Sequence, residues 1–197
     1  MNTMIKNFVA NVIDKVLKTT ALKTTVMKNL VLSCSNEPIS VLKNPELQSS
    51  VVLNKTTTVT IPSVTFGNIP SEKVIELFKD GRVSSHFIEV WISENFPVQH
   101  VKGCKKYDFI DEKYPDTKYD EKTFTKRGCN FCPSNMLGQG RKFDKVVFQE
   151  KTKNLIFCIA SVVDFPVLKV KFVRGTDLIE KYPKGSIPFK DHIKFFN

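Results

Sequence analysis

The pattern of apolar residues changes near residue 103, and this change restricts the possible folds more than any other feature of the chain. Before it, apolar residues recur at helical spacing in residues 4–18, 70–81 and 84–97. After it, short runs rich in Val, Ile and Phe are separated by turn-forming residues, as in strands. Helices followed by several strands predict an α/β (mixed α+β) fold with a central mixed β-sheet flanked by helices.

The strands after residue 103 define the expected core domain, residues 71–197. Residues 105–111 and 117–125 each predict a strand, and residues 143–173 predict three strands separated by turns. Residues 175–183 predict a last short helix. Residues 1–70, with a helix at 4–18 and one or two Val- and Thr-rich strands in 50–66, form a separate segment in this prediction. That segment could serve dimerisation or contact with DNA.

The charge of the chain indicates an anionic partner. It has 30 Lys and Arg residues against 20 Asp and Glu residues, a net charge of +10, and its pI is about 9.4. Such a surplus favours nucleic acid ahead of a membrane surface. The alternative is that the lysines only keep the protein soluble.

The expected location is the cytoplasm. No apolar run approaches the roughly 18 residues that a membrane span needs, so we expect no membrane association. We expect no secretory signal in residues 1–18, because Asn11, Asp14 and Lys15 interrupt their apolar positions, while their basic, amphipathic character leaves an organelle-targeting peptide as an alternative. The five cysteines are then expected to be reduced thiols in a soluble, intracellular protein.

Two acids and a lysine form the candidate catalytic group. Because side chains alternate along a strand, Asp120 and Lys122 point to the same side of the strand predicted at 117–125. Asp108, in the preceding strand, approaches Asp120 if the two strands are neighbours. Mg²⁺ suits such a pair, since it binds oxygen ligands and needs only one or two carboxylates beside water and phosphate. The amine of Lys122 would then orient the attacking water and neutralise developing charge.

This pattern resembles the PD-(D/E)XK nuclease superfamily, and within it type II restriction endonucleases. The matching residues are Asp108 in "YDFID" and Asp120-x-Lys122 in "KYDEKTF", and the resemblance covers about residues 80–175. It implies a restriction-endonuclease-like core, catalysis and Mg²⁺ binding by Asp108 and Asp120, and a catalytic Lys122. It also implies that Glu89, on the helix before these strands, is an auxiliary acid.

Other assignments of the acids remain open. Asp111 can replace Asp108 as the first metal ligand, since spacing does not settle which of them ends the strand. The literal Pro115-Asp116 pair is too close to Asp120 to close a hairpin between the two acids. The whole stretch can also be a charged surface hairpin, in which ion pairs contribute only about 0–1 kcal/mol.

Two further groups of residues are candidates for binding. His100, Cys104, Cys129 and Cys132 have spacing that a structural Zn²⁺ site can use, although reduced cysteines also pack as small apolar residues. Residues 126–140 are expected to form a loop with three Gly and one Pro, and Arg141 and Lys142 follow it directly. The DNA contacts expected there are Lys126, Arg127, Asn135, Arg141 and Lys142.

The sequence therefore favours a Mg²⁺-dependent endonuclease that hydrolyses double-stranded DNA at a short specific site. A homodimer is expected, because a two-fold protein matches a palindromic site. The alternative is a non-catalytic basic nucleic-acid-binding protein, which the candidate zinc site could stabilise.

Overall fold

The computed structural model describes residues 51–197, except 104–105, 134–135 and 137–139. The described residues belong to one compact unit, residues 43–197. The helix predicted at residues 4–18 lies outside the described residues, as do Cys104 and Asn135.

The centre of the described part is a mixed sheet with the strand order β1-β7-β6-β4-β3-β2. Its strands are β1 (Thr56–Thr60), β2 (Val98–His100), β3 (Phe109–Asp111), β4 (Lys118–Phe124), β6 (Leu155–Ser161) and β7 (Val167–Arg174). Strands β4 and β6 are parallel, whereas the other neighbours are antiparallel. A second, two-stranded sheet contains β5 (Cys129–Asn130) and β8 (Ser186–Ile187). The predicted mixed fold is confirmed.

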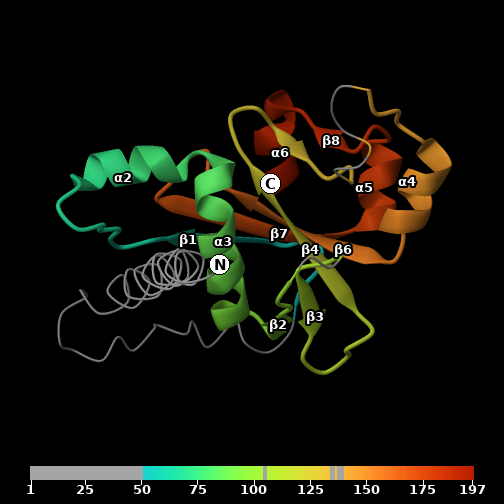
Figure 1. The fold of residues 1–197 in the computed structure, drawn as a ribbon, viewed down its shortest axis with the longest axis horizontal. Helices are drawn as coiled ribbons and strands as arrows, with labels where there is room; N and C mark the ends of the chain where they lie inside the picture. Colours follow the sequence, from blue (N-terminus) through green and yellow to red (C-terminus); the bar gives the residue numbers. More distant parts are fainter. Residues whose placement is uncertain (1–50, 104–105, 134–135, 137–139) are drawn as a thin grey trace, which may run out of the picture. The chain divides into compact units, whose positions relative to one another are not determined.

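Five α-helices accompany the sheet in the part of the chain described. They are α2 (Ser71–Phe78), α3 (Gly81–Asn95), α4 (Lys145–Thr152), α5 (Gly175–Lys181) and α6 (His192–Phe196). In Figure 1, α4, α5 and α6 gather in one part of the molecule, away from α2 and α3. None of the helices in the described ranges has the length and apolar character needed to cross a bilayer.

The two sides of β4 face two different hydrophobic cores. Tyr119 packs in a cluster with Ile88 and Ile92 of α3. Phe124 packs in the other cluster, with Phe148 of α4 and Leu178 of α5. Because strand residues alternate, the odd-numbered residues of β4 face α3 and the even-numbered ones face the side of α4 and α5.

The segment at 145–152 is a helix, so the prediction that it is a strand is wrong. The carboxylate of Asp144 accepts a hydrogen bond from the backbone N–H of Val147 at 3.0 Å and caps the helix. Phe148 and Thr152, four residues apart, are buried, whereas Val146 is 69% exposed. The two adjacent β-branched valines suggested a strand, but the cap and the helical spacing of the buried residues prevail. The other two predicted strands of this region are β6 and β7.

The N-terminal end of α3 lies against β4. The helix begins at Gly81, with Asp80 as its cap, and the carboxylate of Asp80 accepts from the N–H of Arg82. A Cβ atom at Gly81 would lie 3.2 Å from side-chain atoms of Thr123 and Thr125. Glycine therefore permits this close packing, which brings the helix onto the strand that carries the candidate catalytic residues.

The boundary expected at residue 70, between the N-terminal segment and the core domain, lies after β1, which belongs to the main sheet. Residues 56–60 of the expected N-terminal segment form β1, which pairs with β7 along its whole length. These five residues thus complete the edge of the sheet that also contains β4 and β6.

Candidate active site

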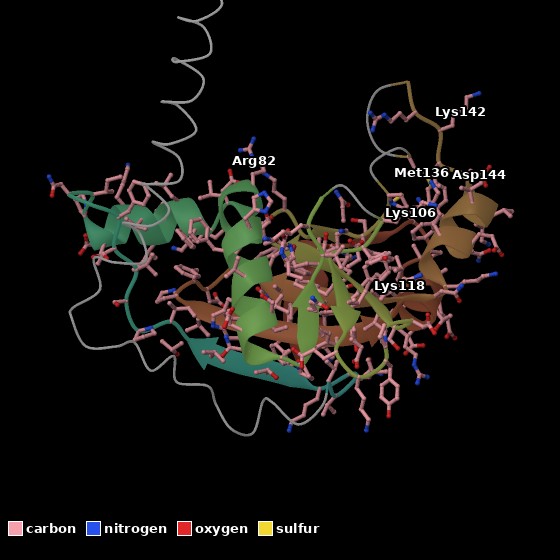
Figure 2. The ribbon with its side chains drawn as sticks, turned by 60° about the horizontal axis from the view of Figure 1, so that its bottom comes forward. Arg82, Lys106, Lys118, Met136, Lys142 and Asp144 are labelled. Carbon is pink, nitrogen blue, oxygen red and sulfur yellow. The ribbon has the colours of Figure 1, made fainter. Side chains whose placement is uncertain are left out.

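A cavity of about 850 Å³ lies on the α4 side of β4. Asp108, Asp120 and Lys122 all line it, so the structure brings the three candidate catalytic residues together. The rest of the wall comes from residues 130–133 around β5 and from the end of α4 and the start of β6. Further lysines of the wall are Lys106, Lys118 and Lys151, and Figure 2 labels the first two.

Strand β4 positions Asp120 and Lys122 as neighbours on one side. The amine Nζ of Lys122 lies 2.8 Å from Oδ2 of Asp120 and donates a hydrogen bond of 2.7 Å to the carbonyl of Glu121. The two side chains are mostly buried, with 28% and 16% of their areas exposed. This pairing follows from the period of two in a strand, as the sequence predicted.

Asp108 reaches the same place because the β3–β4 ladder ends beside it. Phe109 pairs with Tyr119 in the last register pair, so Asp108 lies opposite Asp120, one residue beyond β3. Its backbone N–H donates to the carbonyl of Tyr119 at 2.9 Å. Its carboxylate then accepts the backbone N–H of Glu121 at 2.7 Å. The side chain of Asp108 thus continues the ladder and is held at the edge of β4.

The pKa of Asp120 rises to about 7. Burial is the largest cause, and the charge and hydrogen bond of Asp108 raise it further, against the lowering effect of Lys122. Burial is the largest influence on Lys122 and opposes its charged form, but the combined effect of Asp120, Asp108 and Glu121 outweighs it, and the pKa of the amine rises. The rise in the pKa of Asp120 therefore reflects its burial first and the neighbouring Asp108 second.

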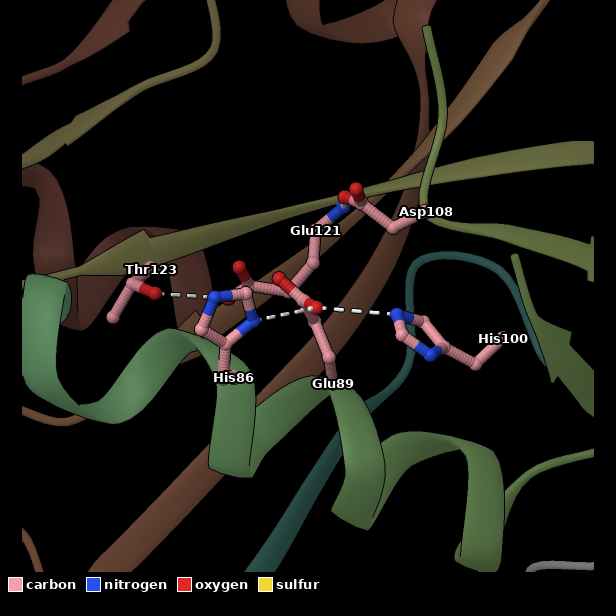
Figure 3. A network of polar contacts seen from close by, with 6 residues as sticks. All are labelled: His86, Glu89, His100, Asp108, Glu121 and Thr123. Carbon is pink, nitrogen blue, oxygen red and sulfur yellow. Dashed lines mark hydrogen bonds and ion pairs between the residues drawn. The ribbon is translucent and has the colours of Figure 1, made fainter. Parts of the chain in front are cut away.

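A different polar network occupies the α3 side of β4 (Figure 3). The oxygen Oε2 of Glu89 lies 3.3 Å from Nδ1 of His86 and 3.2 Å from Nε2 of His100. Glu121 lies near this network, and its Oε1 accepts a hydrogen bond of 3.0 Å from the hydroxyl of Thr123. The structure therefore does not bring Glu89 to Asp120 and Lys122, which lie on the opposite side of β4.

Glu121 is a buried acid that the sequence analysis did not select. It is 6% exposed, and burial, followed by the charges of Asp108 and Glu89, raises its pKa to about 8 although Lys122 and Thr123 lower it. Alternation along β4 predicted that Glu121 points to the other side of the strand from Asp120. That side is buried only because α3 packs over it. The sequence signal for it is its position beside Tyr119 and Thr123 on an otherwise uncharged side of the strand.

The alternative first ligand, Asp111, has another role. Its carboxylate accepts hydrogen bonds from the N–H groups of Lys113 and Tyr114 and from the hydroxyl of Tyr119, the last at 2.7 Å. It stabilises the turn after β3 and does not line the cavity. Asp116 is exposed in the same turn.

The described zinc candidates lie in different environments. Cys129 and Cys132 are buried in the hydrophobic cluster that contains Phe124, whereas His100 contacts Glu89 and the ring of Phe109 on the α3 side. Burial raises the pKa of both thiols, which disfavours the thiolate form that binds zinc. Within the described ranges, no group of three or more His, Cys, Asp and Glu side chains is arranged to hold a metal ion.

The described DNA-contact candidates are all exposed. Lys126 and Arg127 form the turn between β4 and β5, and Arg141 and Lys142 precede α4. Figure 2 shows Lys142 extending from the segment before α4.

Comparison of the chain with protein-family models, curated proteins and solved structures gives no match.

Proposed function

We propose that the protein is a Mg²⁺-dependent endonuclease that hydrolyses double-stranded DNA. One observation carries the proposal: Asp108, Asp120 and Lys122 line one cavity, whose wall contains three further lysines. Two acids with an adjacent amine suit phosphodiester hydrolysis, and the lysines suit a polyanionic substrate. Cleavage at a short specific site by a homodimer, as in type II restriction endonucleases, is the finer form of this proposal.

The donor set fits Mg²⁺. Asp108 and Asp120 are within hydrogen-bonding reach of each other, and this proximity helps to raise the pKa of Asp120 to about 7. Two close carboxylates repel each other, and a cation between them favours the ionised form of both. Mg²⁺ needs only one or two protein carboxylates because it keeps water and binds the substrate phosphate. When bound, it would stabilise charge on the phosphate and acidify a water molecule.

The residues of the chain have separable roles in this proposal. Asp108 and Asp120 hold the cation, and the bond from the Glu121 amide fixes the direction of the Asp108 carboxylate. The Nζ atom of Lys122 lies 2.8 Å from Oδ2 of Asp120. The ammonium group is therefore beside the metal ligands, where it orients water and stabilises negative charge on the phosphate. Lys106 and Lys118 line the same cavity and attract the flanking backbone.

The resemblance to PD-(D/E)XK nucleases supports the proposal in part. Helix α3, the β3–β4 hairpin and the positions of Asp108, Asp120 and Lys122 follow the expected order. Glu89 departs from it, because it faces Glu121 and the two histidines. We therefore leave Glu89 out of the catalytic group.

The test is cleavage of supercoiled plasmid DNA in Mg²⁺ by the wild-type protein and by Asp120→Asn and Lys122→Ala variants. We expect discrete fragments from the wild type and a loss of rate of at least about 100-fold in each variant, with DNA affinity in Ca²⁺ retained. The matched control is Asp116→Asn, which changes an exposed residue in the turn between β3 and β4. This variant should cleave DNA at the wild-type rate. Equal cleavage by Asp120→Asn and the wild type would refute the assignment.

The second candidate is a non-catalytic basic DNA-binding protein. It is favoured because, among the described residues, no three or more His, Cys, Asp and Glu side chains are arranged to hold a metal ion. In that case the wild-type protein binds DNA but yields no Mg²⁺-dependent fragments. The Asp120→Asn variant then behaves like the wild type, because there is no cleavage activity to lose.

A further inference from the structure

A second cavity, of about 640 Å³, lies beside the turn between β4 and β5. Its wall comes from the end of α2, the start of α3 and the turn itself. Thr123 and Thr125 line it, so it opens on the α3 side of β4, whereas the catalytic cavity opens on the other side. Asn130 of β5, an exposed residue, lines both cavities. The β4–β5 turn thus lies between two adjoining hollows.

The charges of the second cavity leave a net positive group at the turn. Two of its cations are paired within the wall: Lys79 lies 3.1 Å from Glu76, and Arg82 lies 2.7 Å from Asp80. The latter carboxylate stays ionised, because the hydrogen bonds from Arg82 lower the pKa of Asp80 to about 2.

The remaining cations of the wall are Lys126 and Arg127. Both are exposed, and within the part of the chain that the structure describes neither forms a salt bridge with a carboxylate. Asp80 also attracts Arg127, but the wall holds four cations (Lys79, Arg82, Lys126 and Arg127) against the two acids Glu76 and Asp80, so an anion at this turn would meet a surplus of positive charge. The turn is well defined, since Thr125 and Gly128 exchange backbone hydrogen bonds of 3.1 and 2.9 Å.

We propose that the DNA whose scissile phosphate occupies the first cavity extends past Asn130, and that Lys126 and Arg127 bind its backbone at the second. This inference rests on the proposed nuclease function and adds to it a second place of contact with the substrate. The ligand it names is a phosphodiester backbone, recognised by charge and without reading of the bases.

The spacing favours a polymer. Lys126 lies four positions after Lys122, at most roughly 13 Å along an extended chain, and the turn at 126–127 shortens this distance. DNA advances about 3.4 Å along its axis for each base-pair step, so the interval is at most about four steps. One phosphate cannot occupy both places, whereas a duplex longer than about four base pairs can. The second contact therefore selects long substrates over short ones.

The test is the salt dependence of binding to a fluorescently labelled duplex of about 30 base pairs, measured by anisotropy in EDTA so that no cleavage occurs. Each phosphate contact contributes about 0.9 to the slope of log affinity against log salt. The double variant Lys126→Gln/Arg127→Gln should lower the slope by about 1.8. Its affinity deficit should then shrink by about 12-fold between about 50 and 200 mM salt.

The control removes the same charge elsewhere. Lys55 and Lys194 are exposed and line neither cavity, so Lys55→Gln/Lys194→Gln should leave the slope within about 0.5 of the wild type. A thermal melt of each protein establishes that it is folded. If the turn variant keeps the wild-type slope, or if both double variants lower it equally, the inference is overturned.

The outcome is separable from that of the proposed function. A wild-type protein that never cuts DNA, but whose slope falls in the turn variant, refutes the nuclease and keeps the contact. A protein that cuts with Asp120 and Lys122 while the turn variant binds normally keeps the nuclease and refutes the contact.

Discussion

Replacing Glu121 by Gln should make the protein more stable at alkaline pH. The side chain is buried, and its pKa rises from 4.5 to about 8 on folding, mainly through burial. Below pH 4.5 the group is protonated in both the folded and unfolded states, so the substitution should have little effect. Between pH 4.5 and 8 the unfolded chain releases the proton and the folded protein keeps it. The stability of the wild type relative to the variant should then fall as pH rises.

The size of the effect follows from the shift. A difference of about 3.5 pH units at about 1.4 kcal/mol each gives an advantage of about 5 kcal/mol for Glu121→Gln at pH 8 and above. This is an upper bound, since entry of water beside the ionised carboxylate would reduce it. Gln keeps the shape of the side chain and an oxygen that can accept the bond from Thr123, which is 3.0 Å long in the wild type.

The assay is urea unfolding of the wild type and Glu121→Gln at each pH unit from 5 to 9. Glu94→Gln, an exposed change on α3, is the control and should give a small difference that does not vary with pH. The difference for Glu121→Gln should grow with pH and level off near pH 8. A difference that stays constant from pH 5 to 9 would refute the conclusion that α3 buries this carboxyl group.

Two other changes test the core and the metal site. Phe148 of α4 is fully buried, so Phe148→Ala should lower the free energy of unfolding by about 3–5 kcal/mol. Val146 of the same helix is 69% exposed, so Val146→Ala should change it by less than about 0.5 kcal/mol. Urea unfolding measures both changes, and similar values would contradict the observed buried face of α4. Mg²⁺ at 100 times its dissociation constant should stabilise the wild type by about 2.7 kcal/mol, and Asp120→Asn should lose this gain while Asp116→Asn keeps it. Thermal melts with and without Mg²⁺ measure the gain, and an undiminished gain in Asp120→Asn would place the cation elsewhere.

The strand that carries the candidate site could be predicted because side chains alternate along a strand, and this alternation is visible in the sequence. Residues 117–125 alternate in a way that puts Asp120 and Lys122 on one side, and the structure has β4 at Lys118–Phe124 with both side chains in one cavity. The approach of Asp108 also followed from neighbouring strands. Local alternation and a short hairpin were sufficient for these features.

Other features depended on contacts between distant segments. Tyr119 and Thr123 mark the uncharged side of β4, but they do not indicate that α3 covers it, so the burial of Glu121 and the position of Glu89 beside His100 could not be derived. The segment at 145–152 contains adjacent valines that favour a strand, and its helical form depends on the Asp144 cap and on burial of Phe148 against other elements. Tertiary packing decided these points.

The alternation within β4 determines where the chain can change in length. The turn at residues 112–116 is exposed, and its hydrogen bonds to Pro97 and Asp111 involve only residues 112–114, so an insertion after Tyr114 can leave the β3–β4 register intact. A single residue inserted just before Asp120 would instead move every following side chain to the other side. The amine of Lys122 would then face α3, and Glu121 would take the place of Lys122 in the wall of the first cavity. Relatives of this protein should therefore differ in the length of the turn and keep the spacing of the strand.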